Sequence, residues 1–217
     1  MRLVFASNNE HKLSEVRGIM PIGIEVLSLR EIGFDREIEE TGATLAENSL
    51  IKAKAVWDYV QTGNARSVKD IDGIFADDTG LEIDALNGEP GVYTARWYKK
   101  EPTISLPAGK EMKEADIFAA NRAKALRELQ GKTDRGAQFR TVITLINLKQ
   151  EIMCVEGVVR GKIAAEEYGE GGFGYDPIFI PEGYNKTFGE LPVKVKNSIS
   201  HRARALEALA RELRIEK

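Results

Sequence analysis

The apolar residues at the start of the chain predict a strand, a polar loop and a helix. Residues 3–6 form an apolar run that stops at the polar residues 7–9. Apolar residues then recur at helical spacing from Leu13 to Met20, as on a helix with one buried face. We therefore expect the polar loop to lie between the end of a strand and the start of a helix.

A second helix is predicted to begin after Thr44. Thr44 and Glu47 have the spacing of a capping box, in which each side chain binds the backbone N–H of the other residue. Apolar residues follow at helical spacing as far as Val60. Asn48 and Lys52 are four residues apart, so they share one face of this helix.

Strands are predicted for the middle of the chain. Residues 74–76 read as a buried strand that ends at Asp77 and Asp78, and a second strand is expected near residues 81–86. If the first strand continues through the two aspartates, their side chains point to opposite faces of the sheet. At most one of them then easily faces a binding cleft.

Two later runs of residues, 139–148 and 152–163, are rich in β-branched side chains and flank a turn at residues 149–150. This arrangement predicts an antiparallel pair of strands. Together with the strand and helix pattern before it, the pair predicts a mixed sheet in an α/β fold. A last helix is expected after Ser200, with leucines on one side.

The composition is that of a globular protein. The 217 residues are 42% hydrophobic and carry a net charge of -3, which suits one domain or two closely joined lobes. An acidic balance provides no positive field for a long nucleic acid. The one cysteine, Cys154, excludes an intrachain disulfide, and we find no apolar stretch suited to a signal peptide or a membrane span. We expect a cytoplasmic protein whose partners include neither a nucleic-acid polymer nor a membrane.

Two polar segments have the chemistry of a phosphate and metal site. Residues 7–12 lie before a predicted helix, where backbone amides and the helix dipole favour an anion, and Lys12 adds a positive charge. Residues 39–42 and 76–80 supply carboxylates of the kind that suit magnesium. The alternatives are an ordinary helix cap for the first segment and capped polar turns for the others.

Two segments near the C-terminus suit a flat polar ligand. In the sequence GGFGYDP, residues 171–177, glycines permit close backbone approach and Phe173 offers a ring for stacking. Asp176 is an acceptor, and Arg202 in SISHRARAL is a donor. A nucleobase would use all of these groups, whereas the alternative is a tight turn with Phe173 in the core. Neither histidine has a metal-binding spacing, and no covalent nucleophile is evident.

Five segments, in order, resemble the inosine/xanthosine triphosphate pyrophosphatases. They are SNNEHK, EETGATLAENSLIKAKA, ADDTGLEIDALNGEPGVYTARW, GGFGYDPIF and KNSISHRARAL. The resemblance runs from residue 3 to about residue 209. It implies a single domain over residues 1–217, with an elongated mixed β-sheet flanked by helices and two lobes around a nucleotide-binding cleft. It also implies a Mg2+ cofactor and a homodimer.

The resemblance also implies residue roles by matching position. Asp78 matches the proton acceptor and, with Glu40, the magnesium ligands, while Lys12 and Lys52 match phosphate-binding lysines. The implied substrate contacts are Ser7, Asn8, Asn9, Glu10, His11, Lys12, Lys52, Thr79, Phe173, Gly174, Tyr175, Asp176, Lys196, His201 and Arg202. The chain departs from many relatives at residues 98–114, which form a longer, lysine-rich segment that we expect to be an exposed excursion.

The implied activity is hydrolysis of ITP, dITP and XTP to the monophosphate and pyrophosphate. Asp78 would orient or deprotonate a water that attacks the α-phosphorus. Arg202 would donate a hydrogen bond to the 6-keto oxygen of hypoxanthine, whereas the 6-amino group of adenine would meet it as a second donor. The alternatives are a related phosphatase acting on other modified nucleotides and a non-enzymatic nucleotide-binding protein.

Overall fold

The computed structural model describes residues 1–63, 71–100 and 113–213. The chain divides into two compact units. Unit 1 comprises Met1–Thr79, Thr141–Val158 and Asn197–Lys217, and unit 2 comprises Gly80–Arg140 and Val159–Lys196. Among the described residues, no helix has the length and apolar character needed to cross a membrane.

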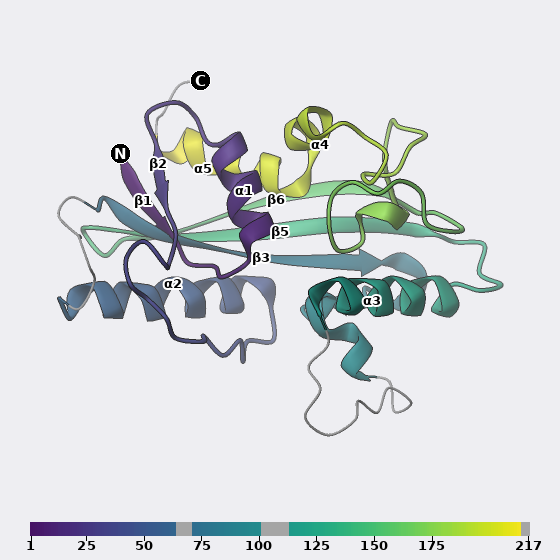
Figure 1. The fold of residues 1–217 in the computed structure, drawn as a ribbon, viewed down its shortest axis with the longest axis horizontal. Coiled ribbons are helices and arrows are strands. Elements are labelled where there is room, and N and C mark those ends of the chain that lie inside the picture. The colour runs from purple at the N-terminus through teal and green to yellow at the C-terminus, as the bar shows by residue number, and fades with distance from the viewer. Residues whose placement is uncertain (64–70, 101–112, 214–217) are drawn as a thin grey trace. The chain divides into compact units, whose positions relative to one another are not determined.

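The elements alternate between strands and helices, as the sequence pattern predicts (Figure 1). In chain order they are β1 (Arg2–Phe5), α1 (Glu10–Ile19), β2 (Glu25–Leu27), α2 (Leu45–Gln61), β3 (Gly73–Ile83), the 3-10 helix η1 (Asp84–Leu86), β4 (Pro90–Gly91), the 3-10 helix η2 (Thr94–Lys100), α3 (Glu114–Glu128), β5 (Gly136–Asn147), β6 (Ile152–Ile163), the 3-10 helix η3 (Asp176–Ile178), β7 (Phe179–Pro181), α4 (Val193–Ile199) and α5 (His201–Glu212).

The strands of the described residues form one seven-stranded mixed sheet, which confirms the predicted fold class. The strand order is β2-β1-β3-β5-β6-β7, and β4 pairs with β3 off this path. β1 pairs in parallel with both β2 and β3, so that Val4 lies opposite Leu27 and Ile74. The β3–β4 and β6–β7 pairs are antiparallel.

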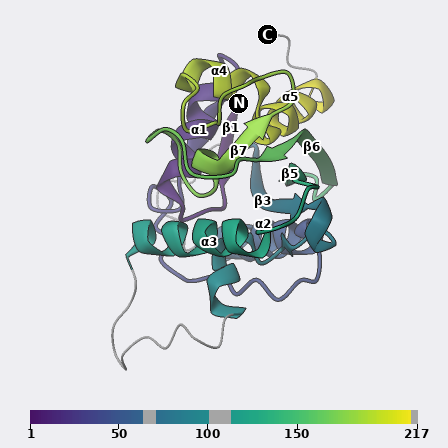
Figure 2. The same ribbon diagram turned by 90° about the vertical axis from the view of Figure 1, so that its right-hand side faces the viewer.

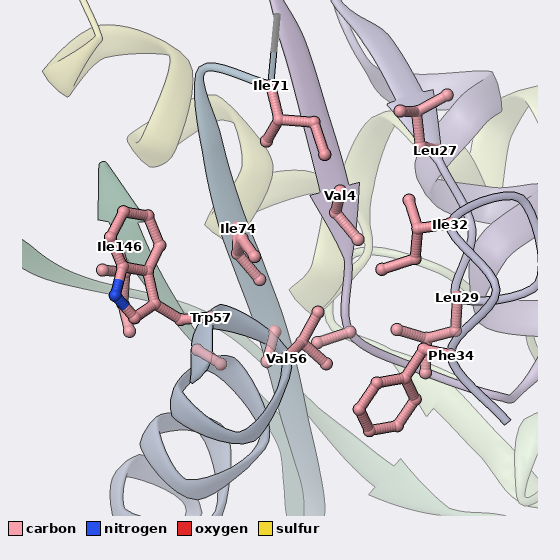
Figure 3. Packing of buried hydrophobic residues seen from close by; sticks show 13 residues of the cluster. Val4, Leu27, Leu29, Ile32, Phe34, Val56, Trp57, Ile71, Ile74 and Ile146 are labelled. Carbon is pink, nitrogen blue, oxygen red and sulfur yellow. The ribbon is translucent and has the colours of Figure 1, made fainter. Parts of the chain in front are cut away.

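In unit 1, α2 covers one face of the sheet, and α1 and α5 cover the other (Figures 1 and 2). Val4 and Ile74 of the central strands pack against Val56 and Trp57 of α2 (Figure 3). On the other face, Phe75 belongs to a second core cluster with residues of α1 and α5. Because side chains alternate along a strand, consecutive residues of β3 enter different cores.

Local capping fixes where the helices of unit 1 begin. The predicted capping box is present at α2, because Thr44 Oγ1 accepts from Glu47 N at 3.1 Å and Glu47 Oε2 accepts from Thr44 N at 3.1 Å. At α5, the Ser200 hydroxyl accepts from Ala203 N at 3.2 Å. Both predicted helix starts are confirmed.

Two predictions about the middle of the chain were wrong. β3 is a single strand that passes through Asp77 and Asp78, and residues 84–86 form η1 instead of the end of a second strand. The strand does not stop at the aspartates because both find cationic partners in the interior.

The predicted exposed excursion at residues 98–114 lies mostly outside the described residues, which do not include 101–112, and at its two ends the prediction was wrong. Tyr98 is buried within η2, and Glu114 begins α3. In unit 2, the buried Asn121 of α3 joins this helix to η2, since its Oδ1 accepts from Tyr98 N at 2.8 Å and its Nδ2 donates to Ala95 O at 3.2 Å.

Candidate active site

The candidate site of unit 1 is built on the two aspartates of β3. Asp78 follows Ile74 and Ala76 on the face that α2 covers, and Asp77 follows Phe75 on the face of α1 and α5. Both side chains are buried, with 1% of Asp77 and 7% of Asp78 exposed. The alternation of the strand therefore presents each carboxylate to a different set of helices.

Asp78 shares one lysine with Glu40. The Lys52 ammonium of α2 donates to Asp78 Oδ1 at 2.7 Å and to Glu40 Oε1 at 2.7 Å. Burial raises the pKa of the Asp78 carboxyl, and the attraction of Lys52 only partly opposes this. For Lys52, burial would lower the pKa, but Asp78 and Glu40 raise it above its ordinary value. Asp78 is thus a buried carboxylate with a raised proton affinity next to a charged lysine.

Asn48, one helical turn before Lys52, links the Glu40 segment to Asp78. Its side chain is fully buried, its Oδ1 accepts from Gly42 N at 2.8 Å, and its Nδ2 donates to Asp78 Oδ2 at 3.4 Å. A Cβ on Gly42 would lie 2.7 Å from Asn48 Oδ1, so only glycine allows this approach. The predicted shared face of Asn48 and Lys52 therefore brings both side chains to Asp78.

Asp77 is held between two cations. Lys12 Nζ donates to its Oδ1 at 2.8 Å, and Arg202 Nε donates to its Oδ2 at 2.9 Å. Burial alone would raise the pKa of Asp77, but Lys12 and Arg202 outweigh it and hold this pKa well below its usual range. Burial also lowers the pKa of Lys12, although Asp77 opposes that shift. Neighbouring aspartates whose pKa values move apart are typical of sites with divided acid and base roles.

Arg202 is a buried anchor of this site. Its side chain is 1% exposed, it forms an ion pair with Glu15 of α1, and its Nη2 donates to Thr79 Oγ1 at 3.2 Å. Together with Asp77, these partners engage all three guanidinium nitrogens. A guanidinium has five N–H donors, so these contacts hold Arg202 in place without using every donor.

The first loop combines a helix cap with one inward lysine. Asn9 caps α1, since its Oδ1 accepts from Lys12 N at 2.9 Å, and Ser7 Oγ accepts from Asn9 N at 3.2 Å. Glu10 and His11 are exposed in the first turn of the helix. The helix cap that we weighed as an alternative is therefore present, while the Lys12 side chain reaches Asp77.

The glycine loop of unit 2 is fastened by Asp176. Asp176 Oδ2 accepts from Phe173 N at 2.7 Å and from Lys196 Nζ at 2.5 Å. Gly172 has a φ of +74°, and a Cβ there would lie 2.0 Å from Asp176 Oδ2. The Phe173 ring is half-buried, with the Lys196 ammonium 4.9 Å from its centroid. A ring, a cation and a carboxylate thus meet at one loop.

Tyr175 and His201 are placed inside the protein. Tyr175 is 3% exposed, and its hydroxyl donates to Thr94 O at 3.1 Å. Burial raises the pKa of the Tyr175 phenol. His201 is 4% exposed at the first position of α5, where Gly157 of β6 leaves room for the helix, because a Cβ on Gly157 would lie 2.2 Å from His201 O. Both predicted substrate contacts are thus buried side chains, each described within its own unit.

The residues of unit 1 have the donor chemistry of a divalent-cation site. Oxygens of Glu40 and Asp78 converge on one point, which the Lys52 ammonium occupies. Among the described residues, no group of three or more His, Cys, Asp or Glu side chains is arranged to hold a metal by itself. Two carboxylates suit Mg2+, which commonly takes one or two and completes its shell with water and phosphate oxygens. The pair fits such an ion if Lys52 moves aside.

The structure groups the predicted residues by unit. Unit 1 holds residues 7–12, Glu40, Lys52, the Asp78–Thr79 pair and the His201–Arg202 pair, whereas unit 2 holds residues 173–176 and Lys196. The sequence-based prediction missed several residues that contact these groups. They are Glu15, Asp77, Phe118, Arg122 and Thr141.

Some of the missed residues had a signal in the sequence. Glu15 lies three residues after Lys12, on the same side of α1, so helical spacing could have suggested it. Phe118 and Arg122 are four residues apart on a helix without a recognisable motif. Only the fold brings that helix to the glycine loop.

Comparison with known proteins identifies relatives along almost the whole chain. The sequence model of the Ham1 family matches residues 3–212. The dITP/XTP pyrophosphatase of Flavobacterium johnsoniae is 45% identical over 209 residues, which cover 96% of each chain. The dITP/XTP pyrophosphatase of Bacillus subtilis is 44% identical over 213 residues, covering 97% of this chain and 96% of the relative. Among solved structures, the Ham1 protein of Staphylococcus aureus superposes with a TM-score of 0.76 at 37% identity, covering 99% of this chain and 98% of that one.

Proposed function

Because this chain belongs to the Ham1 family, we propose that it hydrolyses non-standard purine nucleoside triphosphates, namely ITP, dITP and XTP, to the monophosphate and pyrophosphate. The observation that carries the proposal is that the two neighbouring aspartates of β3 have pKa values shifted in opposite directions. Asp78 has a raised pKa and faces Lys52 and Glu40, while Asp77 is fixed between Lys12 and Arg202. One carboxylate is thus suited to accept a proton, and the other is suited to hold cations in place.

The lysines of unit 1 are suited to bind the triphosphate. Lys52 and Lys12 each carry an ammonium group that now donates to a buried aspartate. A triphosphate offers these ammonium groups several charged oxygen acceptors, so the charge-assisted bonds that they make to the carboxylates can be replaced by bonds of the same kind to phosphate. We propose that phosphate oxygens replace Asp78 and Glu40 as the hydrogen-bond acceptors of Lys52.

Asp78 then acts on the attacking water. With its pKa raised by burial, the Asp78 carboxylate can accept a proton from a water molecule as the oxygen bonds to the α-phosphorus. The bond between the α-phosphorus and the oxygen bridging to the β-phosphorus breaks. Pyrophosphate leaves with that oxygen, and the nucleoside monophosphate keeps the oxygen from water. The reaction needs no covalent intermediate with the protein.

We propose Mg2+ as the cofactor, held by Glu40 and Asp78 once Lys52 has moved to the phosphates. The ion would offset negative charge on the phosphate chain. Asn48 would help to place these ligands, since it donates to Asp78 Oδ2 and accepts from Gly42 N, two residues after Glu40. The homodimer expected from the resemblance is also a proposal, and light scattering on the purified chain tests it.

In unit 2, the Phe173 ring is suited to stack on the purine. Stacking of a base on an aromatic side chain contributes about 1–3 kcal/mol. Asp176 holds the loop that carries this ring, because its carboxylate accepts from Phe173 N. Lys196 in turn donates to the same carboxylate. We propose that these three residues contact the base or hold the ring that does.

A panel of nucleotides tests the proposal. The rates of pyrophosphate release from ITP, XTP, ATP and GTP are measured with Mg2+ and again with excess EDTA. We expect ITP and XTP to be cleaved at least about 100-fold faster than ATP, because a site that donates a hydrogen bond to the 6-keto group is left with an unpaired donor against the 6-amino group of adenine. EDTA should abolish the activity. Equal rates with all four nucleotides would refute the substrate assignment.

A further inference from the structure

Helix α3, which belongs to none of the five motif segments, supports the Phe173 loop from within unit 2. Arg122 Nη1 donates to the backbone oxygen of Gly174 at 3.0 Å. The Phe118 ring, one turn earlier on α3, lies 6.1 Å from the Phe173 ring with an angle of 46° between their planes. Two consecutive residues of the loop are therefore held by one face of a helix.

Arg122 also lies beside an opposite charge. Its Nε is 3.0 Å from Glu167 Oε2, an ion pair by distance that lacks hydrogen-bond geometry, and its side chain is 16% exposed, compared with 41% for Glu167. The charge of Glu167 attracts the guanidinium and does not fix its orientation. The directional contact of Arg122 is therefore its hydrogen bond to the Gly174 carbonyl.

The bond to Gly174 is placed where the loop needs support. Gly174 has a φ of +63°, in the left-handed region, and nothing lies within 4 Å of the position of a Cβ on it. Side-chain packing at Gly174 therefore cannot hold this part of the loop. On the other side of Phe173, the bond from Phe173 N to Asp176 Oδ2 closes the turn.

We propose that Arg122, together with Phe118, is a positioning residue for the base: it fixes the Gly174 carbonyl and thereby holds the Phe173 ring in the orientation that stacks on the purine. The proposal rests on the proposed function, in which Phe173 is the stacking ring. Arg122 acts through the loop and not by touching the reacting phosphates. Its loss should therefore weaken binding of the purine much more than it slows the chemical step.

Kinetics of two variants give the first test. Arg122→Ala should raise the KM for ITP about tenfold, as expected for the loss of a hydrogen bond from a charged donor, and should change kcat less than about threefold. Arg122→Lys keeps the positive charge and a donor but lacks the planar guanidinium that reaches Gly174, so its KM should lie between those of the parent and Arg122→Ala. Arg160→Ala is the matched control, because it removes another ion-paired arginine of unit 2, bound to Asp84 at 2.7 Å. Its KM should equal that of the parent.

A double-mutant cycle separates positioning from a general structural role. If Arg122 acts through the ring, Arg122→Ala should raise KM less than about twofold when Phe173 has already been replaced by alanine. If the tenfold effect persists in the Phe173→Ala background, Arg122 acts independently of the ring and the proposal is overturned.

Amide hydrogen exchange on the protein without nucleotide gives a readout that does not depend on activity. In Arg122→Ala, the amides of residues 172–176 should exchange about tenfold faster than in the parent, because loss of one such bond favours local opening by that factor. Exchange in α2 and β3 should be unchanged, which shows that the variant is folded. Unchanged exchange in the loop would overturn the proposal. If loop exchange rises but the parent does not cleave ITP, the positioning role stands and the proposed function fails.

Discussion

The same substitution should have different effects at the two aspartates of β3: a loss of stability at Asp77 and a loss of turnover at Asp78. Asp77→Asn keeps the shape of the side chain but removes the charge that pairs with Lys12 and Arg202 inside the protein. Removing one partner of a buried ion pair costs about 3–5 kcal/mol. Because Arg202 keeps its ion pair with Glu15, we expect the lower end, about 3 kcal/mol. For a chain of this length, that loss lowers Tm by roughly 6–12 °C.

Asp78→Asn should leave stability within about 1 kcal/mol of the parent but reduce turnover of ITP by about 100-fold or more. The pKa of Asp78 is raised by burial, so its charge is disfavoured in the folded chain, and removing it offsets the loss of its bond to Lys52. Lys52 also keeps Glu40 as a partner. The position of Asp77 on the opposite face of the strand would by itself predict that Asp77→Asn is a silent control for Asp78→Asn. The buried ion pairs of Asp77 show that it is not.

The pH dependence of unfolding checks the sign of this argument. The pKa of Asp77 lies below its ordinary value of 3.8 in the folded chain, so its stabilisation is present above about pH 4 and is lost as the pH falls through the lower folded value. The deficit of Asp77→Asn, measured by urea unfolding monitored with circular dichroism, should therefore be largest near pH 7 and shrink below pH 4. A stability of Asp77→Asn equal to that of the parent at pH 7 would refute the reasoning.

Three other predictions follow from the contacts. Lys12→Ala and Lys52→Ala should each raise the KM for ITP or lower its kcat, while inosine binding measured by calorimetry changes little; unchanged ITP kinetics in both would place the phosphates elsewhere. Gly172→Ala should destabilise the chain more than Gly183→Ala in thermal unfolding, because both have positive φ but only a Cβ at Gly172 meets Asp176 Oδ2, at 2.0 Å; equal losses would contradict this. Thr44→Ala should lower the free energy of unfolding by about 1 kcal/mol through loss of the capping box, and a variant as stable as the parent would show that the cap contributes nothing.

Much of the fold was predictable because local signals and burial agree. The apolar periodicity gave α1, α2 and α5, and the caps at Thr44 and Ser200 marked where two of these helices begin. The continuous strand through Asp77 and Asp78 was not predictable in the same way. Charged residues normally end a buried strand, and the cations that neutralise these two come from helices distant in sequence.

The candidate site shows the same division. The lysines, carboxylates and glycine loop stand in recognisable segments, so the resemblance proposes their roles residue by residue. Two of the partners that fix them do not: Glu15 and Arg122 lie outside those segments and act through contacts made only when α1 and α3 are packed. The expectation that Arg202 reads the purine remains a prediction. Its three partners inside the protein, Asp77, Glu15 and Thr79, could not be foreseen from its place in the sequence beside His201.

Analysis of the products from ITP tests the central claim most directly. The chain is incubated with ITP and Mg2+ in water enriched in 18O, and the phosphorus-containing products are separated and weighed by mass spectrometry. We predict equal amounts of IMP and pyrophosphate, with the heavy oxygen in IMP, because water attacks the α-phosphorus. Formation of IDP and orthophosphate, or of pyrophosphate that carries the label, would contradict the proposed reaction.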